Sequence, residues 1–401
     1  MTSSADVAVI GGGIVGLAIA RQILLDHPGS RVTVFDKEVA IATHASGRNS
    51  GVLHAGFYYA ADSLKARLTR RGNQLLREFC AEMNVTVREC GKVVVAKDDA
   101  ELDTMDVLLR RARANGVELE PVDEAGLREL EPLARTTQRA LWSPTTAVAD
   151  PVAVVEAVAA DFRRLGGELH LGTAVVAARP GRVQTAADAI SVGHIVNCAG
   201  LQCDQVAKWF GMCDDYAVLP FKGVYRYGNW PAGRLRRHVY PVPDLRNPFL
   251  GVHVTVTVDG GVKIGPTAIP ALSRENYGLL RGLRPSEVPA TLRGLSRFLR
   301  NGENDAWGLT RSELRKYSGR VLAAGASQLV PSVRPRDFRR RGRPGIRAQL
   351  VHLRTGSLES DFVLRGDESS THVLNAVSPA WTSSLAVAQH VVADMRDRAV
   401  L

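Results

Sequence analysis

The hydrophobic pattern of the first forty residues predicts a β-α-β unit. A short apolar run at Asp6–Ile10 predicts a strand, and an apolar stretch from Ile14 to about Leu25 predicts a buried helix. A glycine-rich turn, Gly-x-Gly-x-x-Gly, lies between them. A second apolar strand, RVTVFDKE, follows and carries Asp36 near its end, 20 residues beyond the last glycine of the turn. This order is typical of a domain that binds a dinucleotide.

The glycine turn indicates where a pyrophosphate would lie. Gly11, Gly13 and Gly16 allow the backbone to approach phosphates closely, at the positive N-terminus of the predicted helix. Asp36 stands where a carboxylate accepts hydrogen bonds from the ribose hydroxyls of an adenosine. The glycine motif alone is weakly specific. Its position between a strand and a helix, with an acid at the correct distance, makes the prediction of nucleotide binding strong.

The middle of the chain has a different pattern. Strict alternation over 251–266 predicts a β-hairpin with Asp259-Gly260 at its turn. Four valines share one face of its first strand, and His253, Thr255 and Thr257 share the other. An antiparallel sheet between nucleotide-binding segments suggests a domain that caps a substrate. The other predicted helices lie at 64–83, 98–116, from 151 onward and at 385–396, and the other predicted strands at 90–96, 166–178 and 187–200.

Composition narrows the class of protein. The 401 residues leave room for a large core and two domains. Lysine and arginine number 51 against 41 acidic residues, and this net charge of +10 favours anionic ligands or an anionic membrane surface. Five cysteines at irregular spacings, with no CxxC pair, argue against a disulfide framework and against a zinc site. Without a signal-peptide pattern or an apolar run of roughly 18 residues, the cytoplasm is the expected location.

One charge run, RPRDFRRRGR at 334–343, has two interpretations. A solvated loop is the simpler one, and weak peripheral contact with anionic lipid at the inner face of the membrane is the other. Nucleic-acid binding would require a recognisable module, and the sequence contains none. No nucleic-acid partner is therefore expected.

The stretch HASGRNSGVLHAGFYY, residues 44–59, concentrates polar and small residues just after the nucleotide motif. Ser46, Asn49, Ser50 and Gly51 offer short side chains and backbone N–H groups that suit phosphates and ring edges. His54 is either a packed histidine that the backbone satisfies or a residue of a reaction site.

Several dispersed motifs resemble one known family in the same order along the chain. The chain resembles the FAD-dependent oxidoreductases of the D-amino-acid-oxidase and glycerol-3-phosphate-dehydrogenase type, and within them the L-2-hydroxyglutarate oxidases and dehydrogenases. The similarity extends from about Asp6 to Val392. The motifs are NSGVLHAGFYY (49–59), YPVPD (240–244), NPFLGVHVT (247–255), GIRAQ (345–349) and NAVSPAWTSS (375–384).

The resemblance implies an α/β fold in which a Rossmann-like FAD-binding domain is interleaved with a substrate-capping domain of mixed β-sheet plus helices. The FAD-binding domain would comprise residues 1–84, 145–215 and 340–401, and the substrate domain residues 85–144 and 216–339. FAD is the implied cofactor, and no metal is expected. The residues expected to contact FAD are Gly11, Gly13, Ile14, Val15, Gly16, Asp36, Lys37, Ser46, Arg48, Asn49, Ser50, Gly51, Leu53, Val175, Cys198, Ala199, Gly200, Arg347, Pro379, Ala380, Trp381, Thr382 and Ser383.

The resemblance also implies catalytic roles. Oxidation of an alcohol requires a base for the hydroxyl proton, and His253 and His54 are the candidates, with His253 ranked first. Arg347 would clamp the α-carboxylate, Lys222 would serve the distal end, and Tyr240 would donate a hydrogen bond. A capped helix N-terminus at Thr382 or Ser383 would stabilise negative charge on the flavin. For Lys222 a surface position is equally expected.

The expected reaction is oxidation of an L-2-hydroxy acid, L-2-hydroxyglutarate above others, to the 2-oxo acid. Oxygen or a quinone-linked acceptor would then take the electrons. The alternative is an FAD-dependent tailoring oxidase that acts on a hydroxyl or amine of a larger metabolite. It is motivated by departures from the family at Arg48, Lys222 and Trp381. A flavin-carrying protein that binds a membrane or a partner and has lost catalysis is a third, weaker hypothesis.

Overall fold

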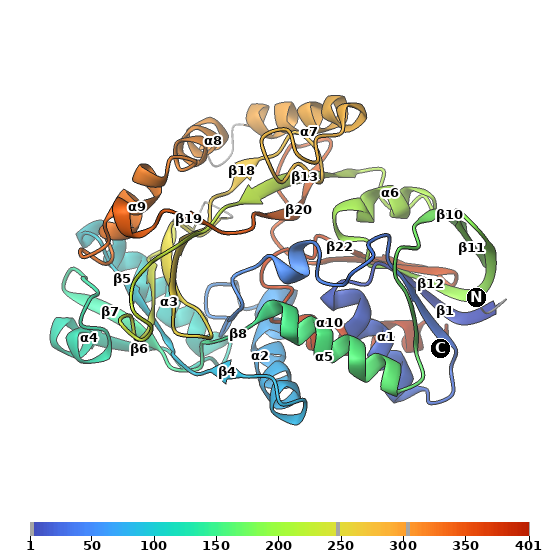
Figure 1. Ribbon diagram of the computed structural model, residues 1–401, viewed down its shortest axis with the longest axis horizontal. Helices are drawn as coiled ribbons and strands as arrows, with labels where there is room; N and C mark the ends of the chain where they lie inside the picture. The colour runs from blue at the N-terminus through green and yellow to red at the C-terminus, as the bar shows by residue number, and fades with distance from the viewer. Residues whose placement is uncertain (1–3, 246–248, 302–304, 401) are drawn as a thin grey trace.

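The computed structural model describes residues 4–245, 249–301 and 305–400 (Figure 1). Asn247, which belongs to one of the family motifs, lies outside the described residues. Within the described ranges no helix is long and apolar enough to cross a membrane.

The first layer of the fold is a largely parallel sheet. β1 lies between β12 and β2, β9 continues the sheet beyond β2, and β22 pairs with the far end of β12, all in parallel. Antiparallel β10, β11 and β21 extend it. The strands are β1 (Ser4–Ile10), β2 (Val32–Phe35), β9 (Glu168–His170), β10 (Val175–Arg179), β11 (Arg182–Thr185), β12 (Ala189–Asn197), β21 (Val363–Gly366) and β22 (Ser370–Leu374).

Helices cover one face of this sheet. In Figure 1 α1, α5 and α10 lie together beneath it, and α2 packs on α10. Apolar side chains of β1, β2 and these helices form one buried cluster, which explains why the α1 stretch is apolar all round. Their bounds are α1 (Ile14–Asp26), α2 (Leu64–Glu82), α5 (Pro151–Arg164) and α10 (Ser384–Asp397). The helices predicted at 64–83, from 151 and at 385–396 are confirmed.

The second layer is a mixed sheet, with strand order β19-β14-β17-β16-β15-β5-β7-β6. Only the β5–β15 pair in it is parallel. Its strands are β5 (Lys92–Val95), β6 (Glu120–Asp123), β7 (Arg139–Ser143), β14 (Arg226–Tyr227), β15 (His238–Pro241), β16 (His253–Val256), β17 (Val262–Gly265) and β19 (Arg340–Arg341). Three helices accompany it, α3 (Leu102–Ala114), α4 (Glu124–Leu130) and α9 (Gly319–Ser327).

The predicted hairpin is β16–β17, and Asp259-Gly260 lies in the turn between them. Val254 and Val256 pack with α9 in an apolar cluster, as the alternation predicts. Alternation alone would leave the opposite, polar face in contact with solvent, but the structure buries it. His253 and Thr255 are 4% and 0% exposed. A buried polar face signals something other than ordinary sheet amphipathicity.

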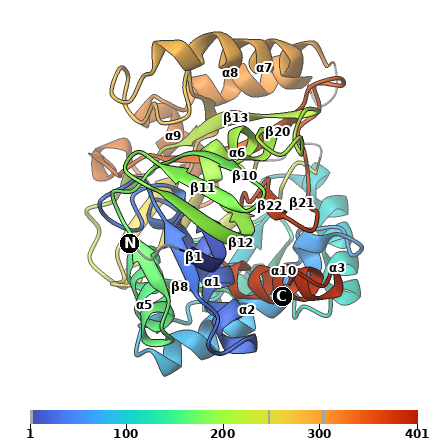
Figure 2. The same ribbon diagram turned by 90° about the vertical axis from the view of Figure 1, so that its right-hand side faces the viewer.

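A smaller antiparallel sheet joins the two layers. β13 (Tyr216–Gly223) pairs with β20 (Gly345–His352) along its whole length and with β18 (Ile269–Pro270) at its end. Figure 2 shows α7 (Val288–Arg300) and α8 (Ala306–Arg315) above it. A fourth, three-stranded sheet consists of β3 (Val52–Leu53), β8 (Ala147–Ala149) and β4 (Val87–Arg88). The domain boundaries drawn from the sequence stay a prediction.

The arginine run is not simply a loop. Arg340 and Arg341 form the edge strand β19, and Phe338 is 1% exposed and packs against Trp230. Arg340 and Arg341 also lie over Tyr227 and Tyr317. The run is therefore anchored by an aromatic residue, and its arginine side chains remain on the surface.

Candidate functional site

A long cleft opens at the carboxyl ends of β1, β2 and β12, where ligands bind in open α/β sheets. All but three of the predicted cofactor contacts line it. The three exceptions pack within the protein and do not face the cleft. Leu53 is fully buried in the core, Gly51 lies against the backbone of Ala149, and Ser383 packs behind the cleft wall beside Thr69. Contact of the remaining residues with FAD stays a prediction.

The dinucleotide turn forms as the sequence predicts. Gly11 has a φ of +110°, a conformation that favours glycine, and an added Cβ there would clash with the backbone of Cys198. Asp36 accepts hydrogen bonds from the N–H groups of Gly12 and Glu38, both at 2.8 Å. Each carboxylate oxygen accepts one of these bonds and retains a free lone pair for a ribose hydroxyl.

The N-terminus of α1 faces this cleft without a side-chain cap at Gly13. The N–H of Ile14 donates to Ser46 Oγ at 3.0 Å, which fixes the 44–51 segment over the first turn. The other first-turn N–H groups have no partner four residues back in the helix, as at any helix start. This end of α1 is therefore suited to an anionic phosphate.

The C-terminal motif approaches the cleft from the other side. Pro379, Ala380, Trp381 and Thr382 line it, and α10 begins immediately after them. The predicted side-chain cap is wrong: Ser383 occupies the N-cap position without a capping hydrogen bond. Thr382 Oγ1 instead donates to the carbonyl of Val52 (3.1 Å) and accepts from the His54 N–H (3.2 Å), because residues 52–54 run directly beside it.

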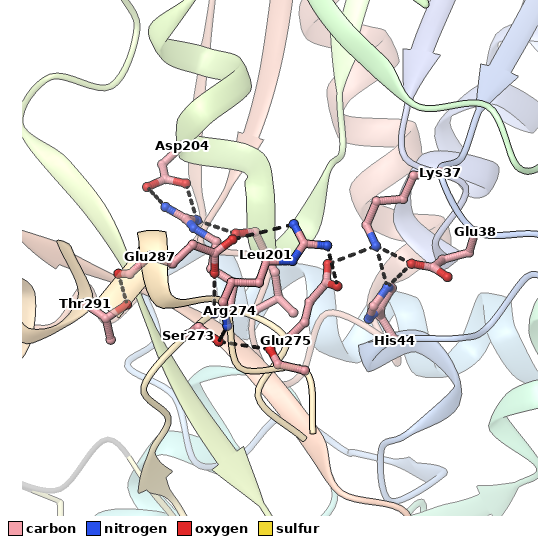
Figure 3. Close-up of polar contacts among 12 residues, drawn as sticks. Lys37, Glu38, His44, Leu201, Asp204, Ser273, Arg274, Glu275, Glu287 and Thr291 are labelled. Carbon is pink, nitrogen blue, oxygen red and sulfur yellow. Dashed lines mark hydrogen bonds and ion pairs between the residues drawn. The ribbon is translucent and has the colours of Figure 1, made fainter. Parts of the chain in front are cut away.

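A strap, residues 273–284, crosses to the nucleotide end of the cleft (Figure 3). Glu275 forms an ion pair with Lys37 at 2.9 Å, and Tyr277 Oη bonds to His44 Nδ1 at 2.5 Å. The base of the strap is anchored by Arg274, which pairs through both terminal nitrogens with the buried carboxylate of Asp204 (2.6 and 2.8 Å). The strap thus holds the capping side of the molecule to the nucleotide-binding side.

The strap also explains a cluster that resembles a metal site. Donor atoms of Glu38, His44 and Glu275 lie within 4.8 Å of one another. Lys37 is ion-paired to both carboxylates. Its ammonium group supplies the cation that the two acids require.

The candidate bases lie close together but differ in exposure to the cleft. His54 lines the cleft, whereas His253 is on the buried polar face of β16, with its ring stacked on Tyr240 at 3.9 Å. His253 Nδ1 donates to the carbonyl of Gly251 at 2.9 Å, so the lone pair is on Nε2. The sequence therefore brings two histidines and a tyrosine into one region.

Burial keeps both histidines neutral. It lowers the pKa of His253 to about 3, and Lys92 adds to the effect while the Gly251 carbonyl opposes it. The pKa of His54 is held well below its ordinary 6.5 by burial, with contributions from Lys92, His253 and His238. At neutral pH each imidazole can accept a proton, though each is a weak base in the protein alone.

Of the two cations predicted to bind the substrate, Arg347 and Lys222, one lines the cleft and the other does not. Arg347 lines the cleft, and its Nη1 donates to the carbonyl of Thr267 at 3.1 Å. Lys222 neighbours it in the sheet but pairs with Ile346, so it lies on the opposite face. Its ammonium group donates to the carbonyl of Gly278 at 2.8 Å. The structure does not bring Lys222 to the cleft, because the strap uses its charge.

The site contains residues that the sequence analysis missed. Four of them are buried close to His54, His253 or Tyr240: Lys92, Tyr58, His238 and Lys263. A fifth, Gln202, lines the cleft. The sequence contains a signal for Lys92. It lies in the apolar strand sequence CGKVVVA, and if that strand is buried on both faces, its lysine is buried too. The others depend on which strands become neighbours.

These features define a dinucleotide-binding α/β protein with a second, capping sheet. A model of the FAD-dependent oxidoreductase family, DAO, matches residues 6–394. The "L-2-hydroxyglutarate dehydrogenase, mitochondrial" of Nematostella vectensis is 37% identical, with 99% of this chain and 91% of the relative covered. The L-2-hydroxyglutarate dehydrogenase of Escherichia coli K12 is 34% identical, with 98% and 93% covered. The chain belongs to the DAO family of FAD-dependent oxidoreductases and, within it, groups with the L-2-hydroxyglutarate dehydrogenases.

Solved structures have the same fold. An FAD-bound L-α-glycerophosphate oxidase from Mycoplasma pneumoniae superposes with a TM-score of 0.76 at 20% identity, with 98% of this chain and 94% of that chain covered. Glycine oxidase from Geobacillus kaustophilus superposes with a TM-score of 0.75 at 18% identity, with 99% of this chain and 95% of that chain covered. The α/β fold with FAD-binding and substrate domains is therefore confirmed.

FAD is the cofactor of the family, and the cleft fits it. The uncapped α1 end suits the pyrophosphate, and Asp36 suits the ribose. Two cleft residues, Trp381 and Gln202, also have a buried indole N–H and a buried amide oxygen with no partner among the described residues. Orphaned polar atoms in a cleft wall are those that a bound ligand satisfies.

Proposed function

We propose that this protein oxidises the C2 hydroxyl of an L-2-hydroxy acid, L-2-hydroxyglutarate above others, to the 2-oxo acid. The observation that carries the proposal is the meeting of a cationic clamp, Arg347, and a neutral imidazole, His54, in one cleft that suits FAD. His253 lies on the buried polar face of β16, and its Nδ1–H bond to Gly251 leaves the lone pair on Nε2. The relatives named L-2-hydroxyglutarate dehydrogenase support the choice of substrate.

Each residue has a defined task in this mechanism. Arg347 holds the α-carboxylate, since a guanidinium fork matches a carboxylate in two hydrogen bonds. Tyr240 orients the His253 ring by stacking on it. His253 Nε2, or His54 in the alternative assignment, accepts the hydroxyl proton. Bound FAD supplies the acceptor for the hydride that leaves C2. Oxygen or a quinone-linked carrier is the proposed final acceptor.

The test is an anaerobic titration of the purified yellow protein with L-2-hydroxyglutarate, followed at the visible flavin band. We expect prompt bleaching with the L-enantiomer and none with the D-enantiomer. An Arg347→Met variant should need far more substrate for half-reduction, because it loses a charge-assisted pair. A flavin that stays oxidised with every 2-hydroxy acid would refute the proposal.

The rival substrate class is a larger hydroxylated or aminated metabolite. Arg48 and Trp381, two of the departures that motivated it, line the cleft, and Arg48 stacks over Tyr277 of the strap at 4.2 Å. Lys222, the third, lies outside the cleft. A screen of amino acids and larger alcohols in the same bleaching assay separates the two classes.

A further inference from the structure

Lys92 is a buried cation without a counterion. It lies in β5, between β15 and β7, and is 0% exposed. Its ammonium group makes no hydrogen bond and no ion pair to any residue in the described part of the chain. Burial of an unpaired ammonium is expensive, so proteins ordinarily pair such a group or place it where a ligand does so.

Three aromatic rings surround the ammonium nitrogen. It lies 4.5 Å from the centre of the Phe57 ring, 4.6 Å from that of Tyr58 and 4.9 Å from that of Tyr240. The hydroxyl group of Tyr58 is also buried and has no partner within the described residues, whereas the hydroxyl group of Tyr240 has that of Thr255 as a hydrogen-bonding neighbour. Two donors without acceptors, the Lys92 ammonium group and the Tyr58 hydroxyl, therefore belong to side chains in contact, and an anionic oxygen-rich group is the kind of ligand that would satisfy both.

This donor cluster adjoins the proposed reaction site. Tyr240 stacks on His253, and the charge of Lys92 acts on both His253 and His54. The charge of Arg347 also acts on His253. Three cations, Lys92, Arg347 and Lys263, thus act on the imidazole, and burial is the cause that lowers the pKa of Lys92.

We infer that Lys92, together with the hydroxyl of Tyr58, binds the second carboxylate of a dicarboxylate 2-hydroxy acid, while Arg347 binds the first. The inference rests on the proposed function and adds to it the distal specificity site. It gives Lys92 the role that the sequence assigned to Lys222.

The experiment uses the FAD-loaded protein and two unreactive probes of equal chain length, glutarate and pentanoate. Binding is read from the perturbation of the visible flavin spectrum. In Lys92→Met the dissociation constant of glutarate should rise about tenfold or more, the loss expected for one charge-assisted hydrogen bond. That of pentanoate should stay within about twofold, because pentanoate has no second carboxylate for Lys92 to bind.

Two further variants keep the test sharp. Tyr58→Phe retains the ring and removes only the hydroxyl. In a normally folded protein it should therefore lower the affinity for glutarate and leave the affinity for pentanoate unchanged. Lys65→Met is the matched control. Lys65 is 7% exposed, lies over the Phe362 ring at 5.8 Å and donates to the Ser360 carbonyl, on the α2 side of the molecule. It should change neither affinity.

The outcomes separate the two proposals. A glutarate-to-pentanoate ratio that is unchanged in both Lys92→Met and Tyr58→Phe overturns the inference, even when the parent protein is bleached by L-2-hydroxyglutarate. The parent flavin could also stay oxidised with every 2-hydroxy acid while Lys92→Met still loses affinity for glutarate. That result supports the carboxylate site and overturns the proposed reaction.

Discussion

Gly72 should be a position where one methyl group disturbs the cofactor side of the molecule. It lies in α2, against the turn that precedes α10. An added Cβ would be 2.5 Å from Ser383 Cα and 2.6 Å from the Thr382 carbonyl oxygen. Both are backbone atoms, so no side-chain rotation relieves the clash. We expect Gly72→Ala to force α2 away from this turn.

The magnitude follows from two opposing effects. The Cβ is about 0.9 Å short of an ordinary 3.4 Å contact, and overpacking of this kind costs about 1–3 kcal/mol. Replacing a helical glycine by alanine returns about 1 kcal/mol of helix propensity. Gly294 in α7 is a buried helical glycine whose added Cβ would meet nothing closer than 3.7 Å. Gly294→Ala therefore measures the propensity gain without the clash.

The assay compares urea unfolding midpoints and FAD content of the two variants. Gly72→Ala should be less stable than Gly294→Ala by about 1–3 kcal/mol. It should also retain less FAD, because Thr382 lines the cleft and anchors the His54 backbone. The reasoning would be refuted by a Gly72→Ala protein that is as stable as Gly294→Ala and fully loaded.

Three other predictions concern charge. Arg274→Met should lower the unfolding free energy by about 3–5 kcal/mol, since it leaves the buried Asp204 unpaired, and Asp204→Asn in the same chain should recover part of the loss in urea unfolding. Burial lowers the pKa of His194 and His372 to about 4 and of His238 and His253 to about 3, so the unfolded chain takes up protons below pH 6.5 that the folded protein refuses. Stability should therefore fall as pH drops from 6.5, by up to about 1.4 kcal/mol per pH unit for each histidine, and unfolding midpoints that do not move between pH 7 and 5 would contradict this. Burial also lowers the pKa of Lys92 to about 7, so glutarate affinity should decrease as pH rises above 7 and lose this dependence in Lys92→Met.

The sequence predicts local elements and the nucleotide end of the site well. The β-α-β unit, the hairpin at 251–266 and the α10 helix follow from short-range periodicity and are present. The position of Asp36 could be predicted because Gly16 and Asp36 belong to the same β-α-β unit. These are positions where the chain itself decides the geometry.

Lys222 and Lys92 show where sequence reasoning fails. Both are lysines in apolar strands, and only the pairing of strands distant along the chain decides where each points. The register of β13 with β20 puts Lys222 opposite Ile346, whereas β5 puts Lys92 beside His238 of β15. A shift of one residue in either register would exchange the faces. Register between distant strands cannot be read from local pattern, so the sequence alone does not decide which way either lysine points.

On the proposed assignment, the charge of the substrate also sets the strength of the base. In the protein alone burial is the main reason that His253 has a pKa of about 3, and the nearby, unneutralised cations Lys92, Arg347 and Lys263 lower it further. A dicarboxylate would neutralise Lys92 and Arg347, remove their part of this lowering, and so make His253 a stronger base for proton removal. A monocarboxylate would neutralise only Arg347. The rate of flavin reduction at saturation should therefore be lower for L-2-hydroxypentanoate than for L-2-hydroxyglutarate in the parent protein. In Lys92→Met the two rates should converge, because the second cation is gone, and a rate difference that persists there would place the discrimination elsewhere in the cleft.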